Sequence, residues 1–149
     1  MLTAYKVFSR LQGNWSFTRV ITNHHEQNLS GVVNGTASFT PVAEDQLFYE
    51  ENGVFKTEAG HELPIHKEYF YRYNRSTQKL EKHFANNKVN TGLFYVLDAN
   101  YAGKHLCSQD NYEARYAFPT QDFNEFELSY IVHGPHKDYV TSTKYRLLS

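Results

Sequence analysis

The sequence has little of what secreted and membrane proteins carry. It contains one cysteine, Cys107, so no disulfide can form within the chain. No stretch approaches the roughly 18 consecutive apolar residues that point to a membrane-spanning helix. Residues 1–11 lack the apolar core and the small-residue cleavage site of a secretory signal. We therefore predict a cytoplasmic protein with no membrane span.

The chain also lacks an excess of charge of either sign. It has 15 Lys and Arg against 16 Asp and Glu, which gives a formal net charge of -1. Non-specific binding to phosphate backbones requires clustered basic charge. We therefore expect no nucleic-acid partner.

Internal repeats, low-complexity segments and long helical periods are missing as well. The one short helical pattern lies at the N-terminus, where Leu2, Tyr5, Phe8 and Leu11 recur at spacings of three. This spacing places them on one face of a short helix, which Gly13 ends.

Aromatic side chains, in contrast, are abundant: 12 Tyr, 11 Phe and 1 Trp make up 16% of the chain. They occur with β-branched residues in short runs that Gly, Asn, Asp or Pro interrupts about every ten residues, which is typical of a meandering all-β domain. At roughly 150 residues per domain, we predict a single domain over residues 1–149. Its expected strands are 14–22, 31–40, 46–52, 53–58, 66–74, 79–85, 92–98, 103–108, 111–118, 125–133 and 138–147.

Adjacent strands joined by short turns favour an up-and-down barrel, because closure removes the exposed edges of a sheet. A barrel of about 8–10 strands is either filled by side chains or holds one small ligand. Gly13, Asn14 and Trp15 match the short Gly-x-Trp signature of the lipocalins and the wider calycin group. That resemblance implies a lipocalin-like barrel in which an arginine from the end of the chain, here Arg146, packs over Trp15 and closes one end.

Arg19 is the first candidate binding residue. If Trp15 points into the barrel, strand alternation directs Arg19 inward too. A buried guanidinium is costly unless it is paired, and its partner is either a protein carboxylate or an anionic group of a ligand. The carboxylates considered as partners are Glu50, Asp110 and Asp138.

His105, Cys107, Asp110 and Tyr112 form the densest group of reactive side chains. One cysteine without a tight histidine pair falls short of the ligands that zinc prefers, so no metal is expected. Cys107 with His105 would suit a nucleophile, and His105 or Asp110 with Tyr112 as proton donor would suit an isomerase, cyclase or lyase. The structural alternative has Asp110 anchoring a turn, Cys107 packed as a buried apolar residue and His105 hydrogen-bonded to a tyrosine.

A turn at residues 134–139 is predicted from its Gly-Pro pair. In this turn Asp138 can cap backbone amides. His136 and Lys137 would lie at a rim, where they meet either an anionic ligand or solvent.

Several motifs occur along the chain: Gly13-Asn14-Trp15 with Arg19, Tyr49-Glu50-x-x-Gly53, Tyr69-Phe70-Tyr71-Arg72-Tyr73, His105-Leu106-Cys107-x-x-Asp110-x-Tyr112, Gly134-Pro135-x-Lys137-Asp138-Tyr139 and Tyr145-Arg146. Together these motifs resemble the domain of unknown function 6314 family, from about Phe8 to Arg146. The resemblance implies a compact lipocalin-like β domain and brings no established activity.

Three classes of function are compatible with such a domain. The first is a small-molecule binding protein that holds an apolar or amphipathic ligand between Tyr and Phe side chains, without a cofactor. The second is an enzyme that performs acid/base chemistry with His105, Asp110 and Tyr112, and the third is a protein-interaction module with a filled barrel. In the first class the orienting residues are Arg19, Tyr71, His105 and Tyr112.

Overall fold

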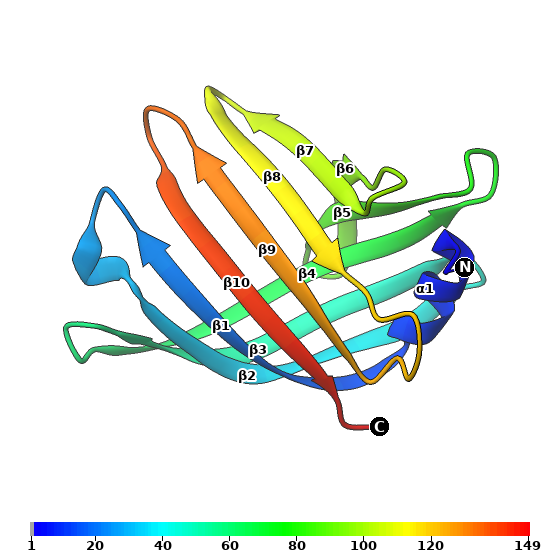
Figure 1. Cartoon of the computed structure of the whole chain (residues 1–149), viewed down its shortest axis with the longest axis horizontal. Helices are drawn as coiled ribbons and strands as arrows, with labels where there is room; N and C mark the ends of the chain where they lie inside the picture. Colours follow the sequence, from blue (N-terminus) through cyan, green and yellow to red (C-terminus); the bar gives the residue numbers. More distant parts are fainter. Residues whose placement is uncertain (1) are drawn as a thin grey trace.

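The structure, a computed structural model that describes residues 2–149, is a ten-stranded antiparallel sheet curled into a nearly closed barrel (Figure 1). Nearly every strand pairs with the next along the chain, and β1 also pairs with β10. The predicted all-β, up-and-down barrel with a short N-terminal helix is therefore confirmed. The elements are α1 (Ala4–Leu11), β1 (Gly13–Asn23), the 3-10 turn η1 (Gln27–Leu29), β2 (Gly31–Ala43), β3 (Gln46–Thr57), β4 (Glu62–Asn74), β5 (Lys79–Asn86), β6 (Val89–Val96), β7 (Ala102–Cys107), β8 (Asp110–Ala117), β9 (Glu125–His133) and β10 (Asp138–Leu147).

The predicted boundary between strands 46–52 and 53–58 is wrong, because both segments belong to β3. Gly53 lies in the middle of that strand, directly opposite Gly35 of β2. A Cβ at Gly53 would lie 2.7 Å from the carbonyl oxygen of Asn34 and 3.2 Å from the Cα of Gly35. This glycine therefore permits a close approach of two backbones and does not mark a turn.

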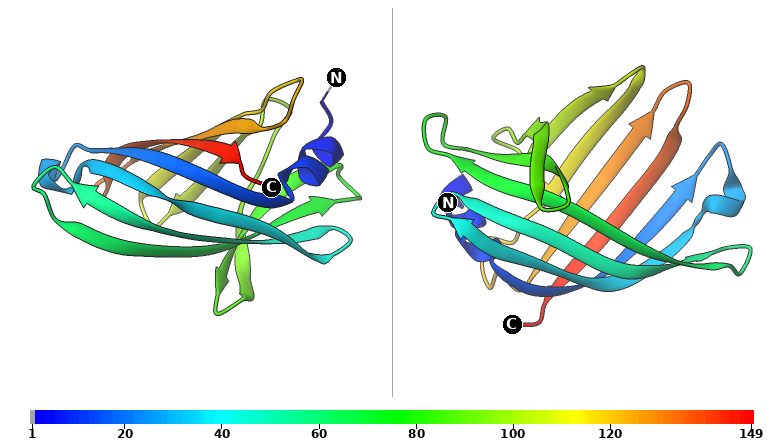
Figure 2. Two further views of the ribbon diagram at one scale, coloured as in Figure 1. Left: turned by 90° about the horizontal axis from the view of Figure 1, so that it is seen from below. Right: turned by 180° about the vertical axis from the view of Figure 1, so that it is seen from behind.

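Helix α1 closes one end of the barrel (Figure 2). Its inward face is Val7, Phe8 and Leu11, all at most 2% exposed, whereas Tyr5 is 54% exposed. Positions i, i+1 and i+4 share a face when each residue turns the helix by about 100°. The buried face is therefore rotated from the predicted one, so that Val7 is buried in place of Tyr5. The indole Nε1 of Trp15 donates a hydrogen bond to the Leu11 carbonyl at 2.9 Å, which joins the helix to β1.

The predicted contact between Trp15 and Arg146 is absent. Trp15 pairs with Leu147 across the β1–β10 ladder, so Arg146 has the opposite parity and faces outward. The Arg146 side chain is 75% exposed and lies 3.2 Å from Glu125. Trp15 instead packs edge-on against Phe126, with 4.9 Å between ring centroids.

Strands β6 and β7 form the two edges of the sheet, and side chains close the seam between them. Irregular pairing in β6 turns both Phe94 and Tyr95 into the interior, as a β-bulge does. Gly103 of β7 lies against Tyr95 so closely that a Cβ there would be 2.5 Å from the tyrosine ring. The His105 ring lies edge-on to Phe84 and Phe94, with centroids 5.5 and 5.3 Å apart.

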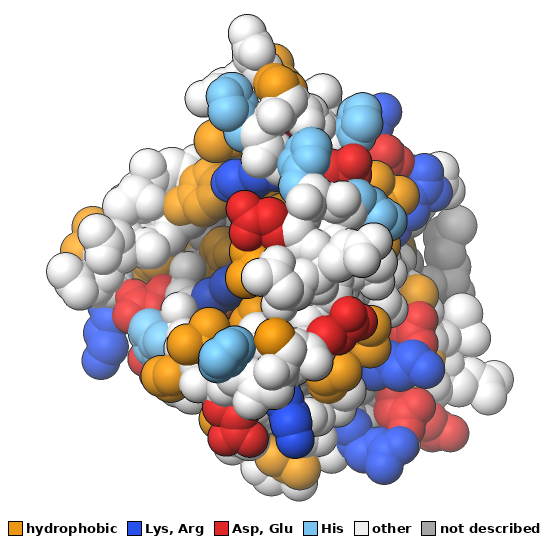
Figure 3. All heavy atoms as spheres, turned by 90° about the vertical axis from the view of Figure 1, so that its left-hand side faces the viewer, with side chains coloured by type: hydrophobic (Ala, Val, Ile, Leu, Met, Phe, Trp, Pro, Cys, Tyr) orange, Lys and Arg blue, Asp and Glu red, His pale blue; other side chains and the backbone are white. Residues whose placement is uncertain are grey.

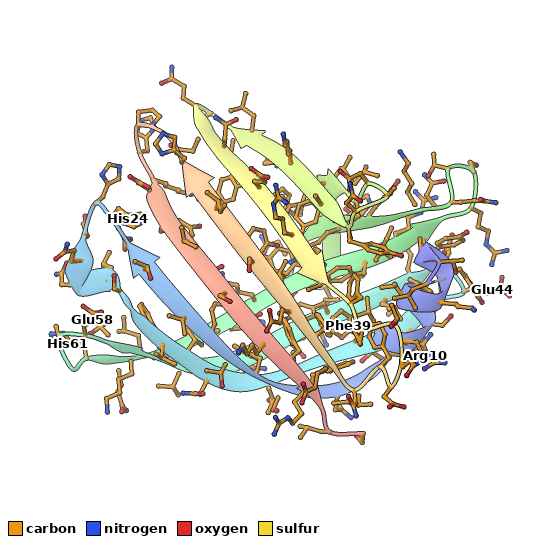
Figure 4. All side chains as sticks on the ribbon, in the orientation of Figure 1. Arg10, His24, Phe39, Glu44, Glu58 and His61 are labelled. Atoms are coloured by element: carbon orange, nitrogen blue, oxygen red, sulfur yellow. The ribbon has the colours of Figure 1, made fainter. Side chains whose placement is uncertain are left out.

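The end opposite α1 is formed by the turns that join β1 to β2, β3 to β4, β7 to β8 and β9 to β10 (Figure 2). Figure 4 shows His24, Glu58 and His61 at this end and Arg10 and Glu44 at the helix end. We refer to the end opposite α1 as the open end. No helix within residues 2–149 has the length and apolar character needed to cross a membrane.

Candidate functional site

A cavity of about 290 Å³ occupies the barrel interior toward the open end. This volume lies at the lower limit of small-molecule sites. Figure 3 looks at the open end, where hydrophobic side chains lie recessed among polar, charged and histidine side chains. Much of the cavity wall is aromatic or aliphatic and includes Ile21, Phe55, Tyr69, Phe94, Leu128 and Tyr130.

A larger depression of about 600 Å³ lies across β1, β9 and β10 and is lined by outward-facing side chains as well as core ones. Its charged residues are paired with one another: Lys144 lies 3.8 Å from Glu127, and Arg146 lies 3.2 Å from Glu125. Exposed pairs of this kind are ordinary surface features. The interior cavity is therefore the better candidate site.

Lys82 is the most unusual side chain in the cavity wall. It points inward from β5 and is only 3% exposed. Its Nζ donates a hydrogen bond to the Tyr130 hydroxyl at 2.8 Å and lies 4.0 Å from the centroid of the Tyr69 ring. Among residues 2–149, no carboxylate forms an ion pair with it. Burial lowers the pKa of Lys82 well below its ordinary value, and the negative charge of Glu51 offsets this only in part.

A chain of buried tyrosine hydroxyls continues from Lys82 into the core. Tyr130 is hydrogen-bonded to Tyr95 at 2.7 Å, Tyr95 to Tyr116 at 2.5 Å, and Tyr116 to Tyr71 at 2.6 Å. Burial raises the pKa of all four tyrosines well above the ordinary value, so each keeps its proton and can donate it. The Lys82 amine is thus held at the end of an ordered polar chain.

Arg19 also lines the cavity, and its guanidinium is paired by groups of the protein itself. It donates to both carboxylate oxygens of Glu51, at 2.8 and 2.9 Å, and to the Thr143 hydroxyl at 2.8 Å. Tyr49 donates a further hydrogen bond to Glu51 at 2.6 Å. Although burial opposes ionisation, the hydrogen bonds from Arg19 keep the pKa of Glu51 below its ordinary value. The pair is therefore charged and bidentate.

None of the three predicted partners of Arg19 is the real one. Glu50 precedes Glu51 on β3 and, by strand alternation, faces outward, where it lies 3.7 Å from His66. Asp110 and Asp138 lie at the open end of the sheet, on other strands. Of the two kinds of partner that the sequence left open for Arg19, the structure has the protein carboxylate, in Glu51.

Asp110 anchors the turn at residues 134–139, whereas the structural interpretation of its motif predicted that it anchors its own turn at residues 108–111. Its Oδ1 accepts hydrogen bonds from the backbone amides of His136 at 3.0 Å and Lys137 at 3.2 Å. A Cβ at Gly134 would lie 2.2 Å from that oxygen, so the glycine is required by the close approach. The prediction that Asp138 caps these amides was wrong, because Asp110 does so from the neighbouring hairpin.

The other members of the motif do not meet at one point. The Tyr112 hydroxyl accepts a hydrogen bond from Lys137 Nζ at 2.7 Å, and its side chain lines the cavity. Cys107 is exposed, which contradicts its expected packing as a buried residue. His105 packs against aromatic rings at the seam and, within the described chain, makes no hydrogen bond to a tyrosine. Of His105, Asp110 and Tyr112, only Tyr112 reaches the cavity.

The predicted ligand-binding residues are thus distributed over three places. Arg19 and Tyr112 line the cavity. Tyr71 lies deeper, as the last hydroxyl of the tyrosine chain, and His105 lies at the seam between β6 and β7.

Sequence reasoning missed Lys82, Tyr130 and Thr141, which all line the cavity. Strand alternation offered a signal for Lys82, because it shares a face with Leu80 and Phe84 on β5. The Thr141 hydroxyl is buried without a hydrogen-bond partner in the described chain. No sequence pattern distinguishes such a hydroxyl from any other threonine on a strand.

Within residues 2–149, one group of side chains that could hold a metal ion lies on the outer face of the barrel. Glu50, His66 and Glu68 place one potential ligand atom each within 4.8 Å of one another. The imidazole of His66 is already hydrogen-bonded to Asn52 at 2.8 Å and to Glu68 at 3.0 Å. This group lies outside the cavity and satisfies its own polar atoms.

Fold and cavity define the class of protein: an up-and-down β-barrel with an interior cavity whose wall is mostly apolar and carries a few polar groups. The chain belongs to a family of unknown function, DUF6314, whose model matches residues 11–147. A comparison with curated proteins found no match.

Solved structures of similar shape include natural and designed barrels. The S-type phycobiliprotein lyase CPES from Guillardia theta has a TM-score of 0.66 at 14% identity, over 99% of this chain and 94% of that one. The designed barrel EF1p2_mFAP2b, bound to DFHBI, has a TM-score of 0.53 at 11% identity, over 98% of this chain and all of that one (100%). The redesigned barrel mFAP0, also bound to DFHBI, has a TM-score of 0.50 at 11% identity, over 92% and 98% of the two chains. At these identities the likeness shows the fold alone.

Proposed function

We propose that this protein binds a small amphipathic molecule inside its barrel. The observation that carries the proposal is the combination of an aromatic-walled cavity with the buried amine of Lys82, which lacks a carboxylate partner. Burying an amine with a single hydrogen bond costs stability. A ligand whose polar group accepts a hydrogen bond from Lys82 would offset that cost.

A second polar atom supports the same arrangement. The buried hydroxyl of Thr141 has no partner within residues 2–149, and Thr141 lies opposite Tyr130 in the β9–β10 ladder. Buried polar atoms are rarely left without a partner in native proteins. Arg19 and Glu51 of the cavity wall are paired with each other, and the other charged residues of the wall, Lys67 and Lys82, are basic. These groups favour a ligand head rich in acceptor oxygens, with an apolar tail against the rings.

The other two classes of function find less support. A filled barrel would leave no interior space of about 290 Å³. Acid/base catalysis needs His105 or Asp110 beside Tyr112 in the cavity, whereas Asp110 is engaged by turn amides and His105 by aromatic rings. The two designed barrels hold DFHBI, which is the kind of occupancy proposed here for a natural chain.

Binding can be tested by calorimetry with 3-phenylpropanol, a probe with one apolar ring and one hydroxyl. We expect saturable binding that Thr141→Val and Lys82→Met each weaken about three- to tenfold, since each removes one hydrogen-bonding group. Lys79→Met, on the same strand but exposed, is the matched control and should leave the affinity unchanged. Native mass spectrometry of gently purified protein should show a co-purifying small mass. Absence of both the mass and any effect of the cavity variants would contradict the proposal.

A further inference from the structure

We propose that Lys82 forms a reversible imine with an aldehyde group of the ligand. The inference rests on the proposed function, because it assigns the chemical class of the molecule that enters the same cavity. It makes the amine a nucleophile as well as a hydrogen-bond donor.

The position of the amine is the first argument. Lys82 Nζ lies within 6 Å of several ring centroids, with distances of 4.0 Å to Tyr69, 5.3 Å to Tyr71 and 5.4 Å to Tyr130. A surface lysine moves among many rotamers, whereas this one is confined by the rings and aimed into the cavity. A carbonyl carbon in the cavity would therefore meet the nitrogen in a fixed direction, which favours addition.

The protonation state of the amine is the second argument, because only a neutral amine attacks a carbonyl. The charged groups near Lys82 are Arg19 on β1, Glu51 on β3 and Lys67 on β4. Two of these three repel an ammonium, and Glu51 is already paired with Arg19. The remaining titratable neighbours are tyrosines: Tyr49 on β3, Tyr69 and Tyr71 on β4, Tyr95 on β6 and Tyr130 on β9. Burial, aided by Arg19 and Lys67, lowers the pKa of Lys82 and so enlarges the reactive fraction.

Tyr130 is placed to supply the proton that the reaction needs. The Nζ lone pair adds to the carbonyl carbon, the π electrons move to oxygen, and one nitrogen proton transfers to that oxygen to give a carbinolamine. The Tyr130 hydroxyl, 2.8 Å from Nζ, then donates its proton as the C–O bond breaks and water leaves. The protonated imine returns a proton to Tyr130, so the net change is loss of one water. Tyr95, hydrogen-bonded to Tyr130 at 2.7 Å, can stabilise the transient phenolate.

The cavity also fixes the class of aldehyde. Its aromatic walls suit a compact apolar tail, and its volume of about 290 Å³ limits the size of the molecule. Because water is a product of imine formation, the largely apolar wall of the cavity favours the imine over its hydrolysis. A small aldehyde with an aryl or alkyl tail meets these conditions.

The test uses the whole protein with 3-phenylpropanal and sodium cyanoborohydride at neutral pH, which reduces an imine and fixes a phenylpropyl group on the nitrogen. Peptide mass spectrometry then compares Lys82 with the exposed Lys79 of the same strand. We expect Lys82 to be modified at least about tenfold faster, because each unit of pKa lowering raises the neutral fraction tenfold. An excess of 3-phenylpropanol should suppress modification of Lys82 only, and Tyr130→Phe should slow it about tenfold or more.

Two results would overturn the inference in distinguishable ways. If 3-phenylpropanol binds but Lys82 is modified no faster than Lys79, the amine is only a hydrogen-bond donor and the proposed function survives. If neither probe reaches the cavity, so that Lys82 stays unmodified and the alcohol does not bind, both proposals fail. Lys82→Met, which keeps the apolar stem, should bind the alcohol more weakly and lose the fast-modified site.

Discussion

Single residues inside this barrel are held in arrangements that cost stability. Lys82 is the clearest case, since its pKa is lower in the folded chain than in the unfolded chain. The unfolded state then binds more protons between the two pKa values, so this residue makes stability rise with pH across that range. Such a side chain is retained at the expense of stability, which is typical of a functional site.

We predict that Lys82→Met raises the free energy of unfolding at neutral pH by about 1–2 kcal/mol. The gain should be larger at about pH 6 than at about pH 10, because near the ordinary lysine pKa of about 10.4 the side chain gives up its charge on folding at little cost. Urea denaturation at the two pH values measures it, with the exposed Lys79→Met as control. A loss of stability in Lys82→Met, or a gain independent of pH, would show that the buried amine is not penalised.

The Arg19–Glu51 pair leads to the opposite expectation for its single variants. Either Arg19→Met or Glu51→Gln leaves a buried partner without its counter-ion and should cost about 3–5 kcal/mol, whereas changing both to Met should cost less than either. Removing the exposed Arg146–Glu125 pair should cost less than about 1 kcal/mol.

The Arg19–Glu51 pair should also make stability depend on pH, because the pKa of Glu51 is lowered in the fold. The contribution of its carboxylate to the free energy of unfolding is present above the unfolded pKa, about 4.3, and is lost as the pH falls through the folded pKa. Denaturation curves of the four variants decide the point.

At the scale of elements, the seam between β6 and β7 depends on contacts that no backbone ladder supports. Gly103→Ala places a methyl group 2.5 Å from the Tyr95 ring, and we expect a loss of about 1–3 kcal/mol from overpacking. In a Tyr95→Leu background, which removes the ring, the same change should cost much less. A double-mutant cycle measures the coupling; equal costs in both backgrounds would mean that the seam relaxes without Tyr95.

Strand positions followed from the sequence more reliably than the faces of the strands did. Alternation correctly directed Trp15 and Arg19 inward, because β1 is regular throughout. It missed the inward position of Glu51, because a strand boundary was placed at Gly53. In the structure β3 is one strand, and its side chains alternate between the two faces across that glycine. The irregular pairing of β6, which turns Phe94 and Tyr95 to the same side, leaves no mark in the sequence pattern.

At the scale of the whole molecule, the site exists because the sheet closes on itself. Lys82 on β5, Tyr130 on β9 and Thr141 on β10 meet only after the curvature of ten strands has been set. The dense motif at 105–112 was conspicuous in the sequence because its residues are close along the chain, and it serves mostly the turn and the seam. A site built from strands far apart in the chain has no local spacing from which it can be read.

The sheet order also predicts how protection from solvent varies around the barrel. Strands β1 and β10 are paired on both sides, whereas β6 and β7 each have a ladder on one side only. Amides of an edge strand that face no partner exchange through small local openings. Hydrogen–deuterium exchange followed by mass spectrometry should therefore show the slowest exchange in β1 and β10 and faster exchange in β6 and β7, despite the buried rings at the seam. Protection in β6 and β7 equal to that in β1 would mean that the two edges pair through their backbones in solution.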